Sequence, residues 1–522
     1  MENVDTAARQ PSLRPYQHAV IQQVSAEIEA GRRRILLVAP TGSGKTVIGA
    51  RLAGEACARG QRVVFLVHRR ELVQQTSQKL HSIARDHGII AAGFPTRPGE
   101  PVQVASIATV HARAVRTASI GLPPADLVIV DEAHHATART WRRLLDSWPG
   151  AIVVGLTATP CRADGRGLGG AFETMVCCPS IAELIEGGWL VPTRVYAPTR
   201  PDLAGVALRG GDYDEGELAA RMDRPGLVGD VVTHWHRLAE RRRTIVFASS
   251  VGHSLHLRDE LGRADVMAAH VDGQTPAAER DAILAGLAGG SIEVVTNCGV
   301  LQEGVDIPAV ECIVLARPTR SLALYRQTVG RGLRPAAGKD HCLVIDHAGA
   351  THEHGFVEDP ITWSLAADSR ALPAVQLARA SPGARVLADC PECSAVRWQG
   401  RPCRACGWRP HAKPIVVDVR DGELGQVERD GTIRKSTASE ADKSAFYRQL
   451  LWIARERGYQ PGWASYRHRE KFGDWPPTRG AQPMAPSSTV RSWVRSRQIA
   501  HARSKAKTGL GARQGAATTG RA

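Results

Sequence analysis

Ala39-Pro40-Thr41-Gly42-Ser43-Gly44-Lys45-Thr46 follows the apolar run Ile35–Val38 and precedes a helix-compatible run, Val47–Cys57. A phosphate-binding loop needs this context, because glycines let backbone N–H groups curl around a β-phosphate and the helix N-terminus adds its positive dipole end. Lys45 can then neutralise the β- and γ-phosphates, and Thr46 can ligate Mg²⁺. The first glycine of the general pattern is Ala39 here, and the remaining residues still allow the turn. The stretch predicts a nucleotide site where a strand meets a helix.

Short β-branched runs alternate with helical stretches on the C-terminal side of this loop. The runs expected as strands are Ile35–Ala39, Arg62–Val67, Val102–Ser106, Leu127–Val130 and Ile152–Gly155 in a first block, and Thr244–Ala248, Asp265–His270, Glu293–Thr296, Cys312–Leu315 and His341–Ile345 in a second. Polar or glycine motifs follow the runs of the first block, and ligands of parallel α/β sheets bind outside the carboxyl ends of the strands. We therefore predict an α/β fold with two tandem parallel sheets.

Two adjacent carboxylates, Asp131 and Glu132, directly follow one of these runs. Asp131 would hold Mg²⁺ through water, and Glu132 would polarise an attacking water. In the second block, Gln327-Thr328-Val329-Gly330-Arg331-Gly332-Leu333-Arg334 places two arginines one helical turn apart, so that both can face one site. Two planar cations are suited to the transition state of a transferred γ-phosphoryl group. A charged surface pair and a solvated arginine-rich helix are the alternatives to these roles.

These motifs, in this order, resemble those of the superfamily 2 helicases and translocases, and the resemblance covers nearly all of residues 10–350. It implies two RecA-like lobes with ATP and Mg²⁺ between them. The further matching segments are Leu13-Arg14-Pro15-Tyr16-Gln17 (adenine recognition), Val67–Leu72 (motif Ia), Thr157–Pro160 (motif III), Phe247–Ser250 (motif IV), and Thr296-Asn297 with Glu303–Pro308 (motif V).

The resemblance also implies roles for single residues. Nucleotide contacts are implied for Arg14, Gln17, Gly304 and Asp306, with Gln17 at the adenine, and Gln327 joins Lys45, Asp131, Glu132, Arg331 and Arg334 in the catalytic set. Nucleic-acid contacts are implied for Arg69, Thr109, Ser249 and Thr296, for which ordinary loop capping is the alternative.

A narrower resemblance concerns the C-terminal part of the chain. The domain order and the stretch Trp463–Trp475 resemble the bacterial RadD DNA-repair helicase family and its phage relatives. This implies a DNA-dependent ATPase in repair or recombination that contacts single-strand-binding protein. An RNA helicase, the motor subunit of a restriction system, and a non-unwinding ATP-gated clamp or scaffold stay open as alternatives.

Four of the eleven cysteines form a compact set, Cys390-Pro-Glu-Cys393 and Cys403-Arg-Ala-Cys406. Four thiolates complete a tetrahedral Zn²⁺ shell and leave no open position, which predicts a structural site. An iron–sulfur cluster is the alternative. The remaining cysteines are scattered, and together with the absence of a secretion signal at Met1–Asp5 they indicate a cytoplasmic protein.

Almost all of the net charge of +15 lies in Arg385–Ala522, which holds 26 basic and 12 acidic residues, a net +14. Six of the eleven tryptophans lie there too. Cations beside aromatic faces suit binding to the backbone and bases of single-stranded or forked DNA without sequence preference. A solvated basic tail is the alternative for the charge, and core packing is the alternative for the tryptophans, which we favour for Trp452.

Length and composition set the outline. A chain of 522 residues suits three or four domains, and 43% apolar with 23% charged residues is typical of a globular protein. No apolar run reaches the roughly 18 residues of a membrane span. We expect a first lobe over 1–197, a linker or insertion over 198–226, a second lobe over 227–370, a four-cysteine zinc module over 385–412, a basic, mainly helical region over 413–500 and a disordered tail over 501–522.

Overall fold

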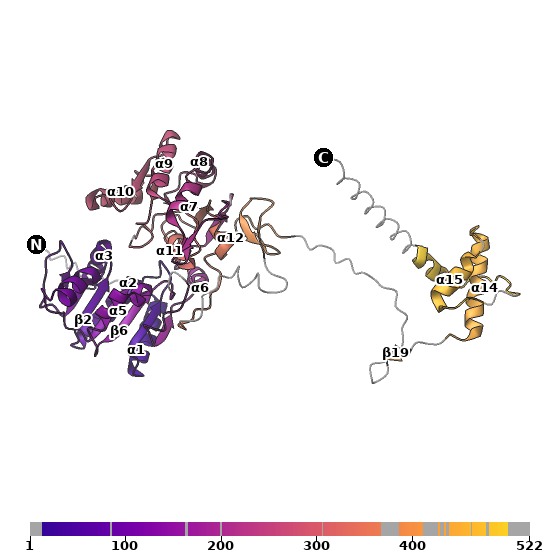
Figure 1. Cartoon of the computed structure of the whole chain (residues 1–522), viewed down its shortest axis with the longest axis horizontal. Helices are drawn as coiled ribbons and strands as arrows, with labels where there is room; N and C mark the ends of the chain where they lie inside the picture. Colours follow the sequence, from indigo (N-terminus) through magenta and orange to yellow (C-terminus); the bar gives the residue numbers. More distant parts are fainter. Residues whose placement is uncertain are drawn as a thin grey trace, which may run out of the picture. The chain divides into compact units, whose positions relative to one another are not determined.

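The computed structural model describes residues 13–83, 86–161, 165–198, 201–304, 306–366, 386–410, 426–427, 433–434, 438–460, 462–476 and 480–498. The chain divides into two compact units, Met1–Ala412 and Lys413–Ala522, which are described separately (Figure 1). No helix among these residues is both long and apolar enough to cross a bilayer.

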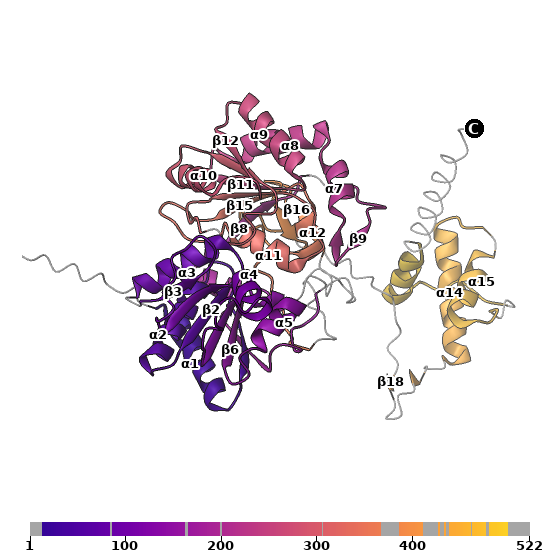
Figure 2. The ribbon, with the colours of Figure 1, turned by 60° about the vertical axis from the view of Figure 1, so that its left-hand side comes forward.

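The first lobe is a seven-stranded parallel sheet in the order β3-β4-β2-β5-β6-β1-β7. Its strands are β1 (Arg34–Val38), β2 (Val63–Val67), β3 (Gly88–Ile90), β4 (Val102–Ser106), β5 (Leu127–Asp131), β6 (Ile152–Thr157) and β7 (Thr174–Cys177). Alternate residues point to opposite faces, so each strand contributes to two cores. One core lies under α1 (Pro15–Glu29), α2 (Lys45–Ala58) and α3 (Arg70–Ser82), and the other under α4 (Ile107–Val110) and α5 (Arg139–Leu145) (Figure 2).

The second lobe is a six-stranded parallel sheet in the order β12-β13-β11-β14-β15-β8. Its strands are β8 (Thr193–Tyr196), β11 (Thr244–Ala248), β12 (Ala268–Val271), β13 (Val294–Asn297), β14 (Cys312–Ala316) and β15 (Cys342–Asp346). One core includes α8 (Pro225–Ala239) and α9 (Val251–Arg263), and the other includes α6 (Ile181–Glu186), α10 (Ala277–Gly289), α11 (Leu322–Gly330) and α12 (Ala350–His354). The two sheets confirm the predicted α/β class with two RecA-like lobes.

Three details differ from the expectations. The first lobe was expected to reach residue 197, but β8 pairs with β15 in the second sheet. The expected linker over 198–226 contains a hairpin of β9 (Leu208–Arg209) and β10 (Asp212–Tyr213) and the helix α7 (Glu215–Met222), which Asp214 caps at its N-terminus. β12 begins three residues later than expected, because Asp265 lies in the left-handed region with φ 56°.

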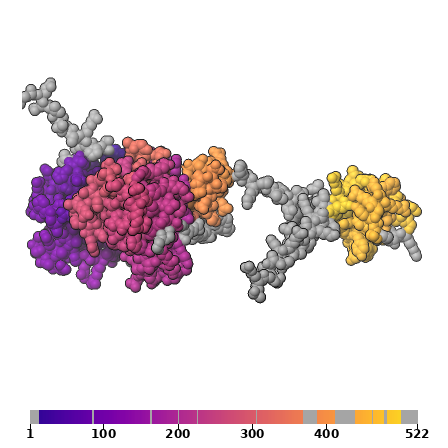
Figure 3. Space-filling view, turned by 90° about the horizontal axis from the view of Figure 1, so that it is seen from above, coloured from indigo at the N-terminus to yellow at the C-terminus, as the bar shows by residue number. Residues whose placement is uncertain are grey.

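The cysteine-rich segment is a hairpin of β16 (Leu387–Asp389) and β17 (Val396–Trp398) that packs on the second lobe. The Trp398 indole N–H donates to Asp359 at 3.2 Å, and its ring meets Phe356 edge to face. Figure 3 shows this module, in orange, against the second lobe. The segment is therefore part of the first compact unit.

The second unit is mainly helical where it is described. It contains α14 (Glu440–Glu456), α15 (Trp463–Phe472) and a helical run over 488–498 around one apolar core, with a short pair of β18 (Gln426–Val427) and β19 (Ile433–Arg434). Trp493 packs in this core, whereas Trp452, which was expected to do so, is 42% exposed. The tail expected over 501–522 lies outside the described residues.

Candidate nucleotide site between the two lobes

Side chains from the start of α1 hydrogen-bond to the loop between β1 and α2. Gly44 is the N-cap of α2 with φ 87°, and a Cβ there would lie 2.5 Å from the Gln17 side-chain nitrogen. The Gln17 Nε2 and the Tyr16 hydroxyl both donate to the Ser43 carbonyl, at 2.9 and 2.6 Å. A glycine is required here because the backbone is left-handed and a neighbour approaches closely.

Gln17 is 4% exposed and does not line the cavity described below, so its expected contact with adenine stays a prediction. Its Oε1 accepts from the Arg14 backbone N–H at 3.0 Å, so both ends of the amide are used inside the protein. Arg14 does line the cavity, and its guanidinium lies 5.0 Å from the ring centre of Trp189. In this conformation Gln17 supports the loop, and Arg14, the N-cap residue of α1, lines the cavity.

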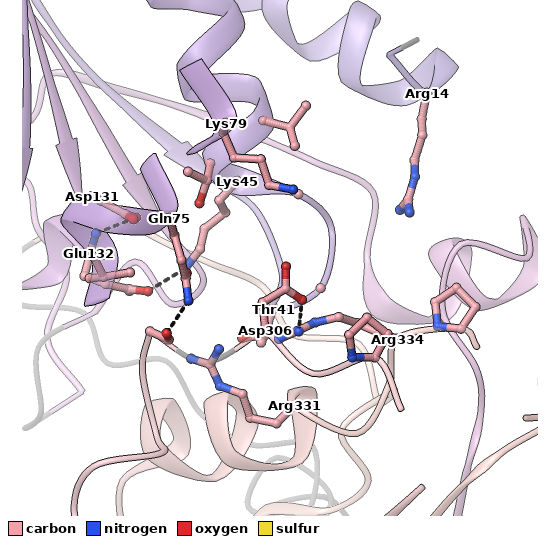
Figure 4. A pocket seen from close by; sticks show the side chains of 18 residues that line it. Arg14, Thr41, Lys45, Gln75, Lys79, Asp131, Glu132, Asp306, Arg331 and Arg334 are labelled. Carbon is pink, nitrogen blue, oxygen red and sulfur yellow. Dashed lines mark hydrogen bonds and ion pairs between the residues drawn. The ribbon is translucent and has the colours of Figure 1, made fainter. Parts of the chain in front are cut away.

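A cavity of about 300 Å³ lies where the two lobes meet. This is the lower end of the range for small-molecule sites, about 300–1,000 Å³. Both lobes line it, and the residues include Arg14, Thr41, Gly42, Gly44, Lys45, Thr46, Asp131 and Glu132 of the first lobe and Gly304, Asp306, Arg331 and Arg334 of the second (Figure 4). The phosphate loop and the two arginines, 285 or more residues apart in sequence, thus face one space.

The predicted acidic pair lies at the carboxyl end of β5. The Lys45 Nζ is 2.8 Å from the Glu132 Oε1, and the Asp131 Oδ1 accepts the Glu132 backbone N–H at 2.9 Å. Burial, together with the adjacent Glu132 charge, raises the pKa of Asp131 to about 6. Burial alone would raise the pKa of Glu132 as well, but the charges of Lys45 and His134 lower it below its usual value. Glu132 is therefore held as a carboxylate beside the phosphate loop.

Thr46 and Asp131 both line the cavity, and Asp131 is 2% exposed. Hydroxyl and carboxylate oxygens are the ligands that Mg²⁺ prefers, with phosphate oxygens and water completing the shell. The donor set fits the expected ion.

Arg331 and Arg334 reach the cavity without sharing a helix. The expectation of one helical turn is wrong, because α11 ends at Gly330 and the two arginines follow in the turn beyond it. Arg331 donates through Nε and Nη2 to the Gln302 carbonyl, at 3.1 and 2.7 Å, and Arg334 pairs with Asp306. Burial lowers the pKa of Arg331 to about 10, so it remains a cation at neutral pH.

Other predicted residues lie elsewhere. Gln327 lines a second cavity together with His134, His135 and Glu303. Ser249 is 4% exposed with its hydroxyl 2.8 Å from the His253 Nδ1, and Thr296 is 0% exposed and donates to the Ser254 carbonyl. These two hydroxyls are engaged inside the second lobe and offer no surface to nucleic acid in this conformation.

The remaining predicted nucleic-acid residues differ from each other. Thr109 is half-buried on α4, and Arg69 lies between the lobes, donating to the Val300 carbonyl at 3.2 Å. Sequence reasoning also missed Gln75 and Lys79 of α3, which line the nucleotide cavity. The Gln75 Nε2 donates to the Gly304 carbonyl at 2.5 Å. No sequence motif marks Gln75 and Lys79, because they become part of a site only where the second lobe approaches α3.

Gly330 allows the close approach of the lobes. A Cβ on Gly330 would lie 2.5 Å from the Thr41 Cβ of the phosphate loop, closer than two carbon atoms can pack. The last residue of α11 therefore has to be a glycine for this arrangement to form.

The four cysteines of the β16–β17 module converge. The Sγ atoms of Cys390 and Cys406 are 3.6 Å apart, those of Cys393 and Cys403 are 3.7 Å apart, and all four lie within 4.8 Å of one another. The sulfur–sulfur edge of a tetrahedral zinc site is about 3.8 Å for Zn–S bonds of about 2.3 Å. The donors therefore fit a tetrahedral metal.

Two families match the chain. Residues 10–162 match the family described as the res subunit of type III restriction enzymes, and residues 228–336 match the helicase conserved C-terminal domain. The two matches cover most of the first lobe and most of the second.

Similar proteins come from a phage, a yeast and a bacterium. A 51.5 kDa protein of a Lactococcus phage (isolate 7-9) is 28% identical over 376 residues, 71% of this chain and 77% of the phage protein. The Saccharomyces cerevisiae protein IRC3, provisionally named an ATP-dependent helicase, is 31% identical over 377 residues, 69% of this chain. These residues span 54% of IRC3, so the chain matches about half the length of that relative.

Among solved structures, a fragment provisionally described as the HsdR subunit of a type I restriction enzyme from Vibrio vulnificus YJ016 has the same fold. The TM-score is 0.53, the identity is 22%, and the likeness covers 68% of each chain. Over both lobes the chain is thus similar to the helicase-type ATPases of superfamily 2, and the Vibrio structure shows the same fold.

Proposed function

We propose that the protein is an ATP-dependent DNA helicase or translocase that acts in repair or recombination. The observation that carries the proposal is the cavity between the lobes, to which the first lobe contributes Lys45 and Glu132 and the second contributes Arg331 and Arg334. Because neither lobe alone holds both halves of the site, hydrolysis depends on how the lobes are placed. This is the coupling that a motor on a strand requires.

The residues divide the chemistry as follows. The phosphate loop and Lys45 bind the β- and γ-phosphates, and Thr46 with Asp131 would hold Mg²⁺, which neutralises developing charge. When the Lys45 ammonium binds a phosphate, its ion pair with Glu132 breaks. The Glu132 carboxylate can then orient the attacking water. Arg331 and Arg334 stabilise the charge on the transferred group from the second lobe.

DNA is the nucleic acid that we favour. The family matched by the first lobe is described as a restriction enzyme subunit, and restriction enzymes act on DNA. In the second unit, Tyr466 and Trp475 are 67% and 52% exposed and meet edge to face at 5.3 Å. The Arg469 guanidinium lies 4.6 Å from the Trp475 ring centre. Exposed rings beside cations suit stacking of unpaired bases.

Three finer assignments complete the proposal. The four cysteines bind one structural Zn²⁺ that braces the β16–β17 module against the second lobe. The likeness to the RadD family supports contact with single-strand-binding protein, and the cysteine usage supports a cytoplasmic location.

The test is ATP hydrolysis with matched DNA and RNA single strands, duplex and forks. We expect DNA to stimulate turnover, and Lys45→Ala to abolish it while DNA binding persists. Arg51→Ala is the matched control, since Arg51 lies exposed on the same helix and pairs only with Glu55 among the contacts described. Wild-type turnover by Lys45→Ala would refute the site. Stronger stimulation by RNA would indicate an RNA helicase. Nicking of DNA in the presence of Mg²⁺ would indicate the motor of a restriction system. ATP hydrolysis without release of a strand from a fork would indicate a translocase or a clamp.

A further inference from the structure

One carboxylate of the second lobe has its partners on the first. Glu303 lies in the loop after β13, and its side chain is 10% exposed. Its Oε2 is 2.9 Å from the His68 Nε2 and 3.6 Å from the Arg69 Nε. Its Oε1 is 3.7 Å from the His134 Nε2 and 3.8 Å from the His135 Nε2. A buried carboxylate is stable only where such partners surround it, so its environment depends on lobe closure.

His134 connects this carboxylate to the catalytic one. Its Nδ1 is 3.3 Å from the Thr157 Oγ1 and 3.4 Å from the Glu132 Oε2, while its Nε2 is 3.7 Å from the Glu303 Oε1. The other oxygen of Glu132 meets Lys45. Burial alone would lower the pKa of His134, but its contacts with Glu132 and Glu303 raise it to about 9. At neutral pH, a positive imidazolium thus lies between two carboxylates, one from each lobe.

The peptide groups beside Glu303 are held from both sides of the seam. The Gln302 carbonyl accepts two N–H groups of Arg331, and the Gly304 carbonyl accepts from Gln75 on α3. The loop that carries Glu303 is therefore tied at once to the arginine of its own lobe and to the first lobe. Any movement of the second lobe that displaces Arg331 must displace Glu303 as well.

We propose that Glu303 is a positioning residue, which through His134 orients Glu132 only when the second lobe is closed on the first. The role rests on the proposed function, because it concerns the same hydrolysis site. In the closed arrangement His134 is fixed at both nitrogens, and this sets the rotamer of Glu132 as Lys45 departs to the phosphate. When the lobes part, Glu303 withdraws, His134 loses one anchor, and Glu132 stays paired with Lys45. Futile hydrolysis by the open enzyme is thereby limited.

The test compares Glu303→Gln and Glu303→Ala with the wild-type chain under steady-state conditions. Misplacing a catalytic group costs up to about 100-fold, so we expect kcat for ATP hydrolysis to fall roughly 10- to 100-fold while KM for ATP changes less than about threefold. Glu311→Gln is the matched control, because Glu311 pairs at 3.3 Å with Arg243 of its own lobe. That variant should keep the wild-type kcat.

Two further readouts separate positioning from loss of structure. In a double-mutant cycle, Glu303→Gln should add little to the loss caused by His134→Asn, since both act through one path. The titratable groups in contact with His134 are Glu132, Glu303 and His135. The charged groups around its two carboxylates are Lys45 at Glu132, His68 and Arg69 at Glu303, and Arg331 near both. Because Glu303 helps to hold the raised pKa of His134, the protonated form is lost as pH rises through about 9, and Glu303→Gln should move this loss of kcat to lower pH.

Hydrolysis is measured with and without DNA, so that the two proposals fail separately. Absence of DNA stimulation in the wild-type chain would count against the DNA motor alone. A Glu303→Gln enzyme with wild-type kcat in both conditions, or additive losses in the double variant, would overturn the role of Glu303. A matched fall of kcat in Glu311→Gln would overturn it too.

Discussion

Replacing Arg331 by alanine tests whether the second lobe contributes directly to hydrolysis. The side chain is 9% exposed, lines the nucleotide cavity, and spends two of its five N–H donors on the Gln302 carbonyl. An arginine supplied to a phosphoryl transition state contributes about 10³–10⁵ in kcat, or ~4–7 kcal/mol at about 1.36 kcal/mol per tenfold. We expect a loss of that size in Arg331→Ala.

The same substitution also affects the fold, and the two effects can be separated. Removing the guanidinium leaves the partly buried Gln302 carbonyl without these donors, which costs up to about 1–3 kcal/mol of folding stability. ATP affinity should change less than about tenfold, because the phosphate loop and Lys45 belong to the other lobe. Arg331→Lys retains charge but not the planar fork, so it should recover only part of the rate.

The assay is single-turnover hydrolysis at saturating DNA, with binding of a fluorescent ATP analogue and thermal unfolding measured in parallel. Arg320→Ala is the control, since Arg320 is an exposed arginine of the same lobe. A kcat within about tenfold of the wild-type value in Arg331→Ala would refute the reasoning, as it would place the guanidinium away from the transferred phosphoryl group.

Three further predictions concern the seam, the second unit and the cysteines. Gly330→Ala should reduce DNA-stimulated kcat about tenfold or more, because the new methyl meets Thr41 and holds the lobes apart; unchanged kcat would contradict the packing argument. Trp475→Ala should weaken single-strand binding about 5- to 150-fold in a fluorescence titration, the value of one lost stack at about 1–3 kcal/mol. Trp493→Ala should instead lower the melting temperature, because that ring packs in the core. Loss of single-strand binding in Trp493→Ala with unchanged binding in Trp475→Ala would show that DNA contacts another surface. Cys403→Ser should remove zinc measured by elemental analysis, and iron in the wild-type protein would disprove the zinc assignment.

The phosphate loop and the two sheets were predictable because their signals are local. A parallel strand covered on both faces must be apolar along its whole length, and β2 and β14 have such sequences. The turn between β1 and α2 needs a residue that accepts a positive φ, which marks Gly44. Asp131 and Glu132 follow from the rule that functional residues end such strands.

Local signals were insufficient where a residue type serves two purposes. Gln17, Ser249 and Thr296 have side chains that can contact a ligand or satisfy a buried backbone group, and the structure uses them for the protein's own hydrogen bonds. Likewise, Arg331 and Arg334 share a surface through a turn, although their spacing suggested a helix. The same donors and acceptors can bind a ligand or satisfy the protein's own backbone, so the spacing of residues does not distinguish these two uses.

By itself, the amino-acid order predicted a nucleotide site at the end of β1, since backbone freedom, helix dipole and charge all lie within a few consecutive residues. Only the tertiary structure decided that Glu303 meets His68 across 235 positions, that Gly330 lies against Thr41, and that β8 joins the second sheet. Contacts of this kind depend on how two separately folded lobes approach each other. The free energy of that approach is summed over side chains distant in sequence, so no short segment records it.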